Sequence, residues 1–306
     1  MDESSVSRLI GAIVVVYYPD LLLLDNLLLR LQHCAHIVIV KNDPVSINSE
    51  FWSATKEKYS EFTVLQMHKN LGVAGALNRA FDVLSALEIP YAWTFDQDSS
   101  PAEDAGVKLL SQFRCLKQSE FRCAAVVPKV FDSRTQVPLP FIVESSEKKL
   151  QLVIPVGGMP VCCAITSGML IDMAALRNIG YMDESLFIDH VDTEWCFRAR
   201  SKGYGIYLVH EAHMGHELGD VLNIRFLGLR LSIRIRSALR AYYIFRNGWL
   251  LGGLSYSPAG WRNYFARCAF RMSLIAMIFG PNRLGQAQAI IRAYFDYQKI
   301  GIRAQS

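Results

Sequence analysis

Short apolar segments alternate with longer helix-like segments through the first hundred residues, and this order restricts the fold more than any other feature. The apolar segments are rich in β-branched residues and end at breakers such as Pro19 and Pro44. We expect strands over residues 12–16, 37–40, 62–66 and 91–95, and helices over 21–31, 50–59 and 75–87. Alternating strands and helices predict βαβ units, and therefore an α/β fold with a mostly parallel central sheet flanked by helices.

Ligands of such sheets bind beyond the carboxyl ends of the strands. The polar residues that follow the expected strands are Tyr18, Asn42, Asp96 and Asp98. Further along the chain we expect a helix over 101–116, strand-forming segments over 124–130 and 141–154, and an apolar stretch over 161–172. A ligand site is therefore predicted at the strand ends of the first hundred residues.

Charge is distributed unevenly along the chain. The formal net charge is only +4, which argues against a general nucleic-acid-binding protein. Residues 221–306 hold thirteen Lys and Arg and a single acid, whereas residues 1–220 hold 19 basic and 27 acidic residues. We expect two regions, 1–220 and a basic, aromatic-rich helical region 221–306, and the second suits an anionic membrane surface. A helical packing domain or an oligomer interface is the alternative.

No segment has the pattern of a signal peptide or a membrane span. Two acids precede the first apolar run, and no apolar run reaches ~18–20 residues. The seven cysteines include no CxxC pair, as expected for reduced thiols in a cytosolic protein. We therefore expect a cytoplasmic protein that associates peripherally with the inner face of the cell membrane.

Asp96 and Asp98 form the strongest local feature, an Asp-X-Asp pattern at the end of an apolar strand. Two such carboxylates can hold one hard cation, and Mg²⁺ or Mn²⁺ accepts them while keeping positions open for phosphates. The alternative is a solvated turn in which Asp98 or Ser99 caps the next helix.

A second acidic group lies at an expected helix start within residues 181–198. Asp189 and Asp192 are three positions apart and share a helix face, whereas Glu194 points elsewhere. The helix dipole keeps a carboxylate of the first turn ionised, which suits a general base and a helix cap equally.

His210, His213 and His216 are spaced by three, as for a zinc site on a helix, but the strand-like residues 204–209 and Gly215 favour a loop. Scattered polar histidines are one interpretation, and a single histidine that completes a carboxylate-bound metal is the other. Upstream, Gly72 and Gly75 lie in a turn that leads into a helix. They either expose backbone N–H groups to an anion or allow close packing.

Eight segments occur in a characteristic order from Val14 to Asp220. They are Val14-Val15-Val16-Tyr17-Tyr18-Pro19, Val40-Lys41-Asn42, Asn70 to Asn78, Phe95-Asp96-Gln97-Asp98-Ser99, Thr166 to Leu170, Gly180 to Glu184, Val191 to Arg198 and His216 to Asp220. In this order they resemble glycosyltransferase family 2, which has the nucleotide-diphosphosugar (GT-A) fold. The segments at 95–99 and 191–198, with Arg240-Ala241-Tyr242-Tyr243 and Arg246-Asn247 downstream, are most similar to the bacterial rhamnosyltransferase branch.

The resemblance implies roles for individual residues. Region 1–220 would be the catalytic domain, with a donor half of about 1–100 and an acceptor half of about 101–220. Asp192 would be the general base of an inverting transfer, and Asp98 and His216 would ligate Mg²⁺ or Mn²⁺, with His213 as the alternative to His216. The residues implied to bind the donor are Tyr18, Pro19, Asn42, Asn70, Gly72, Asn78, Asp96 and Asp98, and those on the acceptor side are Gly168, Met169 and Glu194.

One position departs from the family's pattern. Many relatives have an acid where this chain has Lys41, and that acid accepts the N3–H of a pyrimidine base. Lysine cannot accept a hydrogen bond. Recognition of thymine or uracil must therefore fall to Asn42, Asp43 or backbone carbonyls.

The resemblance also implies a reaction. It is the transfer of L-rhamnose from dTDP-rhamnose to a growing cell-surface polysaccharide, such as O-antigen or capsule, carried on a polyprenyl diphosphate. A UDP-sugar donor, such as UDP-galactofuranose or UDP-glucose, is one alternative. A non-catalytic nucleotide-sugar-binding or membrane scaffold protein is the other.

The start of the basic region predicts an amphipathic helix. Apolar residues recur there at helical spacing, and arginines fall roughly opposite them. Such a helix suits an anionic leaflet, at about 1 kcal/mol per basic residue near the membrane. The apolar residues are Ile224, Leu227, Leu231, Ile235, Ala238 and Tyr242, and the arginines are Arg225, Arg236 and Arg240.

Overall fold

The computed structural model describes residues 8–43, 49–59, 61–119, 121–154, 157–216, 221–226, 229–234, 236–280 and 282–303. The chain forms two compact units. Unit 1 comprises Met1–Val143, Leu152–Phe187 and Val191–Glu217. Unit 2 comprises Glu144–Gln151, Ile188–His190 and Leu218–Ser306, so two short segments from the middle of the chain belong with the C-terminal region.

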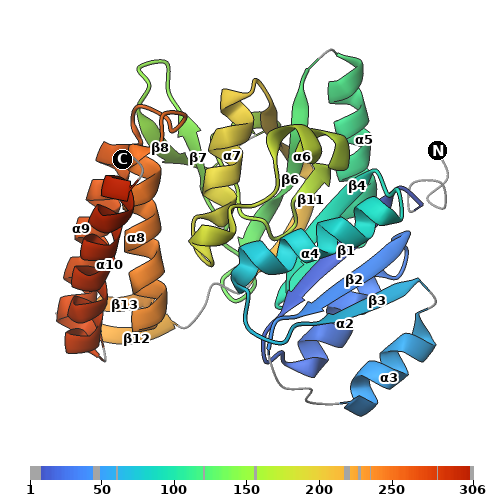
Figure 1. Cartoon of the computed structure of the whole chain (residues 1–306), viewed down its shortest axis with the longest axis horizontal. Helices are drawn as coiled ribbons and strands as arrows, with labels where there is room; N and C mark the ends of the chain where they lie inside the picture. The colour runs from blue at the N-terminus through green and yellow to red at the C-terminus, as the bar shows by residue number, and fades with distance from the viewer. Residues whose placement is uncertain are drawn as a thin grey trace. The chain divides into compact units, whose positions relative to one another are not determined.

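Unit 1 is built on a mixed sheet (Figure 1). Over the described residues its nine strands follow the order β3-β2-β1-β4-β10-β6-β11-β5, with β9 paired to β11. The pairs β1–β2, β1–β4, β2–β3 and β6–β11 are parallel. The strands are β1 (Ile10–Val16), β2 (His36–Lys41), β3 (Phe62–Gln66), β4 (Tyr91–Asp96), β5 (Ser99–Pro101), β6 (Cys123–Asp132), β9 (Met159–Val161), β10 (Leu170–Asp172) and β11 (Gly205–His216). The predicted α/β class with a mostly parallel central sheet is confirmed.

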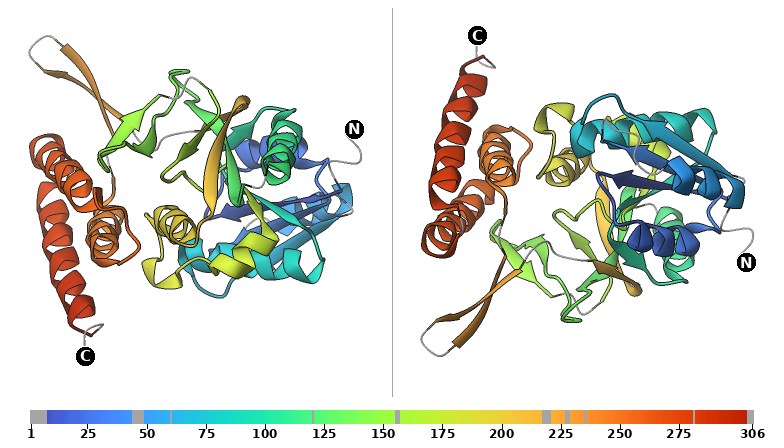
Figure 2. Two further views of the ribbon diagram at one scale, coloured as in Figure 1. Left: turned by 90° about the horizontal axis from the view of Figure 1, so that it is seen from above. Right: turned by 90° about the horizontal axis from the view of Figure 1, so that it is seen from below.

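Helices lie on both faces of this sheet. Figures 1 and 2 show α2 and α5 on one face and α4, α6 and α7 on the other. The helices of unit 1 are α2 (Leu21–Leu31), α3 (Ser49–Lys58), α4 (Gly72–Ala86), α5 (Ala105–Gln118), α6 (Met173–Ile179) and α7 (Val191–Ser201), with a 3₁₀ turn η1 (Glu184–Leu186).

The first crossover shows why these residues adopt these elements. The Asp20 carboxylate accepts from the backbone N–H groups of Leu22 and Leu23, at 2.9 and 3.2 Å, and so caps the start of α2. Four leucines at helical spacing are fully buried against the sheet, and each contributes about 1.5–3 kcal/mol. They are Leu24, Leu27, Leu28 and Leu31.

Unit 2 contains three long helices, α8 (Ala238–Gly253), α9 (Trp261–Phe279) and α10 (Arg283–Arg303). Helix α8 approaches α9 at Gly248, whose carbonyl accepts from Trp261 Nε1 at 3.0 Å. A Cβ at residue 248 would lie 2.0 Å from the Phe265 ring, so only glycine permits this approach. Of the helices within the described residues, none combines the length and hydropathy needed to cross a membrane.

The start of the basic region corrects the sequence-based expectation. The amphipathic helix predicted from Ile224 onward is wrong up to Arg234, because this stretch is an antiparallel hairpin of β12 (Val221–Phe226) and β13 (Leu229–Arg234). Apolar pairs such as Ile224↔Leu231 alternate with polar pairs such as Asn223↔Ser232. This period of two is typical of a strand. The sequence-based prediction missed it because Ile224 and Leu231 also fit a helical spacing. Leu227 and Ile235 lie outside the described residues, and Ala238 and Tyr242 lie in α8.

Two further segments differ from expectation. The loop favoured for residues 210–216 is wrong, since they extend β11, which has an irregularity between Val209 and His213. The strand-forming segment 141–154 is two paired strands, β7 (Phe141–Glu144) and β8 (Leu150–Val153), joined by a turn that includes Lys148 at φ 57°. None of the seven cysteines, all of which lie within the described residues, forms a disulfide bond.

Candidate active site

Asp96, Asp98 and His216 come together at one edge of the unit 1 sheet. Strand β4 ends at Asp96, and the short strand β5 pairs with β11 so that His216 lies opposite Ser99. As a result, one ligand atom from each of the three side chains lies within 4.8 Å of the other two. Pairing between distant strands therefore assembles a potential metal site from residues at positions 96, 98 and 216.

The geometry and chemistry of this cluster fit a divalent cation. His216 Nδ1 lies 3.5 Å from Asp98 Oδ1, and His216 Nε2 lies 3.9 Å from Asp96 Oδ2. Nδ1 is buried and has no hydrogen-bond partner among the described residues. Two carboxylates and one imidazole are ligands that Mn²⁺ accepts, and Mg²⁺ accepts the carboxylates. His213 is outside this cluster. Its ring lies edge-on to the Phe131 ring, and the two ring centres are 5.5 Å apart.

The segment 166–169 holds the end of β4 beneath this cluster. Ser167 is buried, and its Oγ lies 2.5 Å from Ser99 Oγ. Gly168, at φ 81°, donates its N–H to Thr94 O at 2.7 Å, and a Cβ there would lie 2.7 Å from Met214 Sδ. Gly168 and Met169 were predicted on the acceptor side, but Met169 is fully buried and its side chain packs in the core. The structure therefore uses this segment to support the strand that carries Asp96.

Asn42 and Asn70 organise the turn that leads into α4. Asn42 Nδ2 donates to Asn70 Oδ1 and to Gly72 O, both at 3.0 Å, and Asn42 Oδ1 accepts from Leu71 N at 2.8 Å. Asn70 Oδ1 also accepts from Gly72 N at 2.8 Å. The Asn42 amide is thus engaged by protein groups on both its donor and its acceptor side.

The start of α4 is also tied to the segment that precedes α7. Gly72, at φ 71°, lies so close to Phe187 that an added Cβ would be 2.2 Å from Phe187 O. Phe187 O accepts from Val73 N at 2.7 Å. Buried Asn78 donates to Met182 O and accepts from Met182 N, each at 3.0 Å. The structure places Gly72 and Asn78 in these internal contacts.

Lys41 and Asp43 are the neighbours of Asn42 in the sequence, and the contacts of their side chains differ from those of the Asn42 amide. Lys41 is buried, with Nζ 5.1 Å from the centre of the Trp52 ring. Asp43 is only 3% exposed, and its Oδ1 accepts no hydrogen bond from any described residue. Because a buried acceptor without a donor is costly, this oxygen is suited to a ligand donor.

The end of β1 carries Tyr17, Tyr18 and Pro19. Tyr18 adopts φ 46°, and its side chain is half exposed. The rings of Tyr17 and Tyr18 are edge-on, with their centres 4.7 Å apart. Tyr17 N donates to Gln97 Oε1 at 2.8 Å, which links this strand end to the Asp96–Asp98 turn. The role of Gln97 was missed in the sequence, where it is only the middle residue of the Asp-X-Asp pattern.

Asp192 lies in the first turn of α7. Its Oδ1 accepts from Thr193 N at 2.7 Å and from Thr193 Oγ1 at 3.2 Å. Burial raises the pKa of the Cys163 and Cys196 thiols far above their ordinary value, and the charge of Asp192 adds to both shifts. These thiols are therefore neutral, and they add no negative charge beside the carboxylate.

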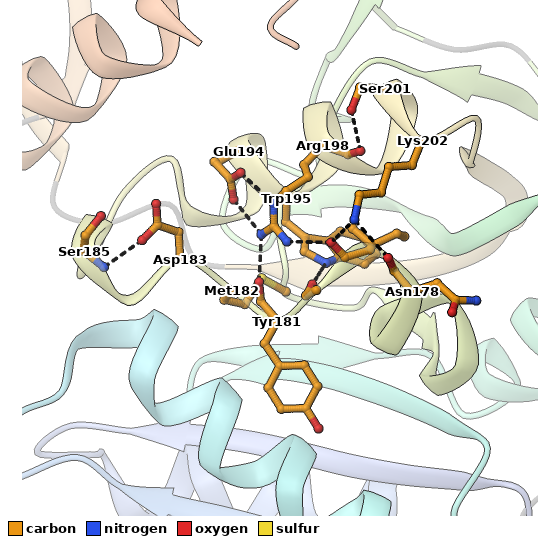
Figure 3. A network of polar contacts seen from close by, with 12 residues as sticks. Asn178, Tyr181, Met182, Asp183, Ser185, Glu194, Trp195, Arg198, Ser201 and Lys202 are labelled. Atoms are coloured by element: carbon orange, nitrogen blue, oxygen red, sulfur yellow. Dashed lines mark hydrogen bonds and ion pairs between the residues drawn. The ribbon is translucent and has the colours of Figure 1, made fainter. Parts of the chain in front are cut away.

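Glu194 lies within an internal ion pair rather than at a surface (Figure 3). Its two oxygens accept from Arg198 Nε at 2.8 Å and Nη2 at 2.9 Å. Arg198 also donates to the carbonyls of Ile179 and Tyr181, at 3.0 and 2.7 Å. Glu194, predicted on the acceptor side, is placed where it holds α7 against the end of α6.

Residues 188–190, which lead directly into α7, are held within unit 2. Asp189 and His190 adopt φ 60° and 63°, and Arg240 Nη2 lies 2.5 Å from Asp189 Oδ1. Buried Asn247 donates to the carbonyls of Ile188 and Asp189, at 2.9 and 2.8 Å. The sequence signal for this contact was the Arg240 and Arg246-Asn247 pattern, which carried no assigned role.

Comparisons with known proteins were made over the whole chain. No protein-family model matches it. The chain is 28% identical over 246 residues to the dTDP-rhamnosyl transferase RfbF of Shigella flexneri, a match that covers 79% of each protein. Among solved structures it is similar to GalNAc-T7 with UDP, GalNAc and Mn²⁺, with a TM-score of 0.58 and 12% identity. It is also similar to S. aureus TarS, with a TM-score of 0.57 and 13% identity.

The two structural matches cover almost all of this chain but only part of each solved protein. Each match includes 94% of this chain, but the chain spans only about half the length of either protein, 54% and 48%. The structural likeness therefore shows the fold, and the sequence likeness to RfbF indicates the enzyme class. The chain is a glycosyltransferase with the GT-A fold, and it is similar to the dTDP-rhamnosyl transferase RfbF.

Proposed function

We propose that this protein is an inverting, metal-dependent rhamnosyltransferase that moves L-rhamnose from dTDP-rhamnose to a growing cell-surface polysaccharide. The observation that carries this proposal is the cluster of Asp96, Asp98 and His216 at the sheet edge. The likeness to a dTDP-rhamnosyl transferase over 79% of the chain supports the choice of donor.

Asp98 and His216 would hold Mg²⁺ or Mn²⁺, and Asp96 would support the ion or contact the nucleoside sugar of the donor. The buried, unpartnered Nδ1 of His216 beside the Asp98 carboxylate supports this assignment. When bound, the ion supplies positive charge next to the diphosphate leaving group.

Asp192 acts as the general base. Its carboxylate takes the proton of the acceptor hydroxyl while that oxygen forms a bond to the anomeric carbon of rhamnose. The bond from this carbon to the diphosphate oxygen breaks on the opposite face, so dTDP leaves and the configuration inverts. The position of Asp192 at the start of a helix favours the ionised form, and its proton transfer contributes about 10²–10⁴-fold in rate.

Asp43 accepts the N3–H of the donor base. Asn42 and backbone carbonyls were the other candidates. The Asn42 side chain already donates to Asn70 and Gly72 and accepts from Leu71, whereas Asp43 Oδ1 is buried and accepts from no described residue. Lys41, which replaces the usual acid, is directed to the Trp52 ring instead. Thymine and uracil both carry an N3–H, so this contact selects a pyrimidine and not one of the two.

The acceptor is a glycan carried on a polyprenyl diphosphate at the inner face of the cell membrane. The excess of basic residues in 221–306 supports a location beside anionic lipid. An acceptor on a lipid carrier would be presented at such a surface.

A panel of donors tests the proposal. The purified chain with Mn²⁺ and a lipid-linked acceptor is expected to consume dTDP-rhamnose and to release dTDP, while UDP-galactofuranose and UDP-glucose remain intact. Asp192→Asn should abolish transfer yet bind dTDP normally, and Glu103→Gln, at an exposed position of unit 1, serves as the matched control. Turnover of UDP-sugars alone would make the donor assignment wrong, and binding of donor without any turnover would indicate a non-catalytic sugar-nucleotide-binding protein.

A further inference from the structure

Helix α9 exposes an apolar face that lacks any acidic residue. The residues of α9 include Arg262, Arg267 and Arg271 and neither Asp nor Glu. Phe270 is 70% exposed and Leu274 is 49% exposed, although both are large apolar side chains. A helix of a water-soluble unit ordinarily keeps its outward face polar, so this face is unusual for one in contact with water alone.

Several of the exposed residues of α9 lie on one side of the helix. They recur at steps of three or four positions, with their immediate neighbours alongside, which is the spacing of one helix face. This surface, called the α9 face below, consists of Arg267, Phe270, Arg271, Leu274, Met277 and Ile278, all of them exposed. Within the part of the chain that is described, Arg267 and Arg271 are exposed and form no ion pair, so their charge is available to an external anion.

Helix α10 repeats the pattern within the same unit. Leu284, Ile291 and Phe295 are exposed at spacings of seven and four, and Phe295 is 58% exposed. The single acid, Asp296, is paired with Arg292 and Lys299 and accepts from Tyr242 Oη at 2.8 Å. These contacts hold the pKa of Asp296 below its ordinary value, first through the Tyr242 hydrogen bond. Neither helix offers an unpaired carboxylate to a partner.

We propose that the α9 face binds an anionic membrane surface, with its apolar side chains in the headgroup region and its arginines at the lipid phosphates. Exposed apolar area and cations on one helix face are the two attractions that hold an interfacial helix. The long arginine side chains reach the headgroups while their stems cover apolar surface. The proposal rests on the membrane location given in the proposed function and deepens it by naming the surface that binds; it holds whichever sugar is transferred.

A second copy of this chain fits the α9 face less well. A two-fold interface brings the same patch of both copies together, so Arg267 and Arg271 would meet their own counterparts. Like charges at a shared interface disfavour it, and no carboxylate of α9 is present to compensate. An anionic lipid surface has the complementary charge.

Vesicle binding of the full chain tests the proposal independently of catalysis. The protein is expected to sediment with mixed phosphatidylglycerol–phosphatidylcholine vesicles, to remain free with pure phosphatidylcholine, and to be released at high salt. Phe270→Ser with Arg271→Gln should weaken binding about tenfold or more, since one basic residue alone accounts for about fivefold. Leu22→Ser with Lys56→Gln removes one apolar and one basic exposed side chain from unit 1 and should leave binding unchanged.

Both altered positions of α9 are exposed, so the variant should keep its circular dichroism spectrum and melting temperature. Three outcomes would overturn the proposal. They are failure of the wild-type chain to bind anionic vesicles, equal binding by the α9 variant, and a wild-type dimer that the α9 variant converts to monomer without vesicle binding. Since no donor or acceptor is present, failure here would leave the assignment of the transfer reaction untouched.

Discussion

At the scale of single residues, the site depends on side chains that the sequence separates widely. His216 meets Asp98 only because β5 and β11 pair at Ser99 and His216. The Asp-X-Asp pattern identified two of the three possible ligands, since both follow one strand. The choice between His213 and His216 required the register of β11, which turns His213 toward Phe131.

The contact of Asp43 with the donor base leads to a prediction about nucleotide affinity. Asp43→Leu removes the acceptor and should weaken dTDP binding about tenfold to hundredfold, because the base N3–H would be buried without a partner. Asp43→Asn retains a carbonyl oxygen and should restore much of the affinity. Titration calorimetry with dTDP measures both. Unchanged affinity in Asp43→Leu would show that another group accepts from the base.

At the scale of elements, the accuracy of each predicted helix or strand depended on the hydrophobic period of its segment. The strands and helices of the first hundred residues were predicted within a few residues, because each carries one clear period and ends at a breaker. The hairpin β12–β13 was missed because Ile224 and Leu231 satisfy both a helical and a strand pattern. Glu194 has a position that no pattern indicates, because its burial depends on Arg198 reaching the carbonyls at the end of α6.

The segment before α7 carries a prediction about pH. The His190 ring lies edge-on to the rings of Trp261 and Phe265. Burial lowers the pKa of His190 from the ordinary 6.5 to about 4, with Asp189 opposing and Arg236 assisting this shift. Between about pH 6.5 and pH 4 the unfolded chain binds a proton that the folded chain excludes. The free energy of unfolding should therefore fall as pH falls through this window, by about 3 kcal/mol at most, and this contribution should be intact above it.

Denaturant unfolding at several pH values measures this effect. His190→Asn should flatten the dependence on pH, and asparagine tolerates the positive φ of this position. Exposed His33→Asn is the matched control and should keep the slope of the wild type. An identical slope in His190→Asn would mean that other groups cause the acid sensitivity.

At the scale of the whole molecule, residues 1–220 and 221–306 carry opposite excesses of charge, and the proposed tasks divide between them. The acidic first region supplies the proposed metal and donor residues, and the basic helices supply the α9 face. Ligands that bind only the folded state stabilise it, so the proposed donor site can be tested without measuring transfer.

Mn²⁺ together with dTDP should raise the melting temperature of the chain by a few degrees, since a ligand at 100 times its Kd contributes about 2.7 kcal/mol. Neither excess chelator with dTDP nor the variant Asp98→Asn should show this increase. Asp104→Asn, an exposed carboxylate on the same unit, should behave as the wild type. Differential scanning calorimetry gives the midpoints, and an increase that persists in chelator would argue against a metal at Asp96, Asp98 and His216.

The amino-acid order alone determined the α/β class, the strand ends that carry polar residues, and the family whose motifs the chain resembles. These properties are local, because they depend on hydrophobic period, on breakers and on short motifs. The tertiary structure decided which histidine joins the two aspartates, that Asn42 and Glu194 are engaged internally while Asp43 Oδ1 accepts from no described residue, and that α9 leaves an apolar, basic face exposed. Each of these depends on strand register or on packing between distant segments, and no local pattern records which partner a side chain will meet.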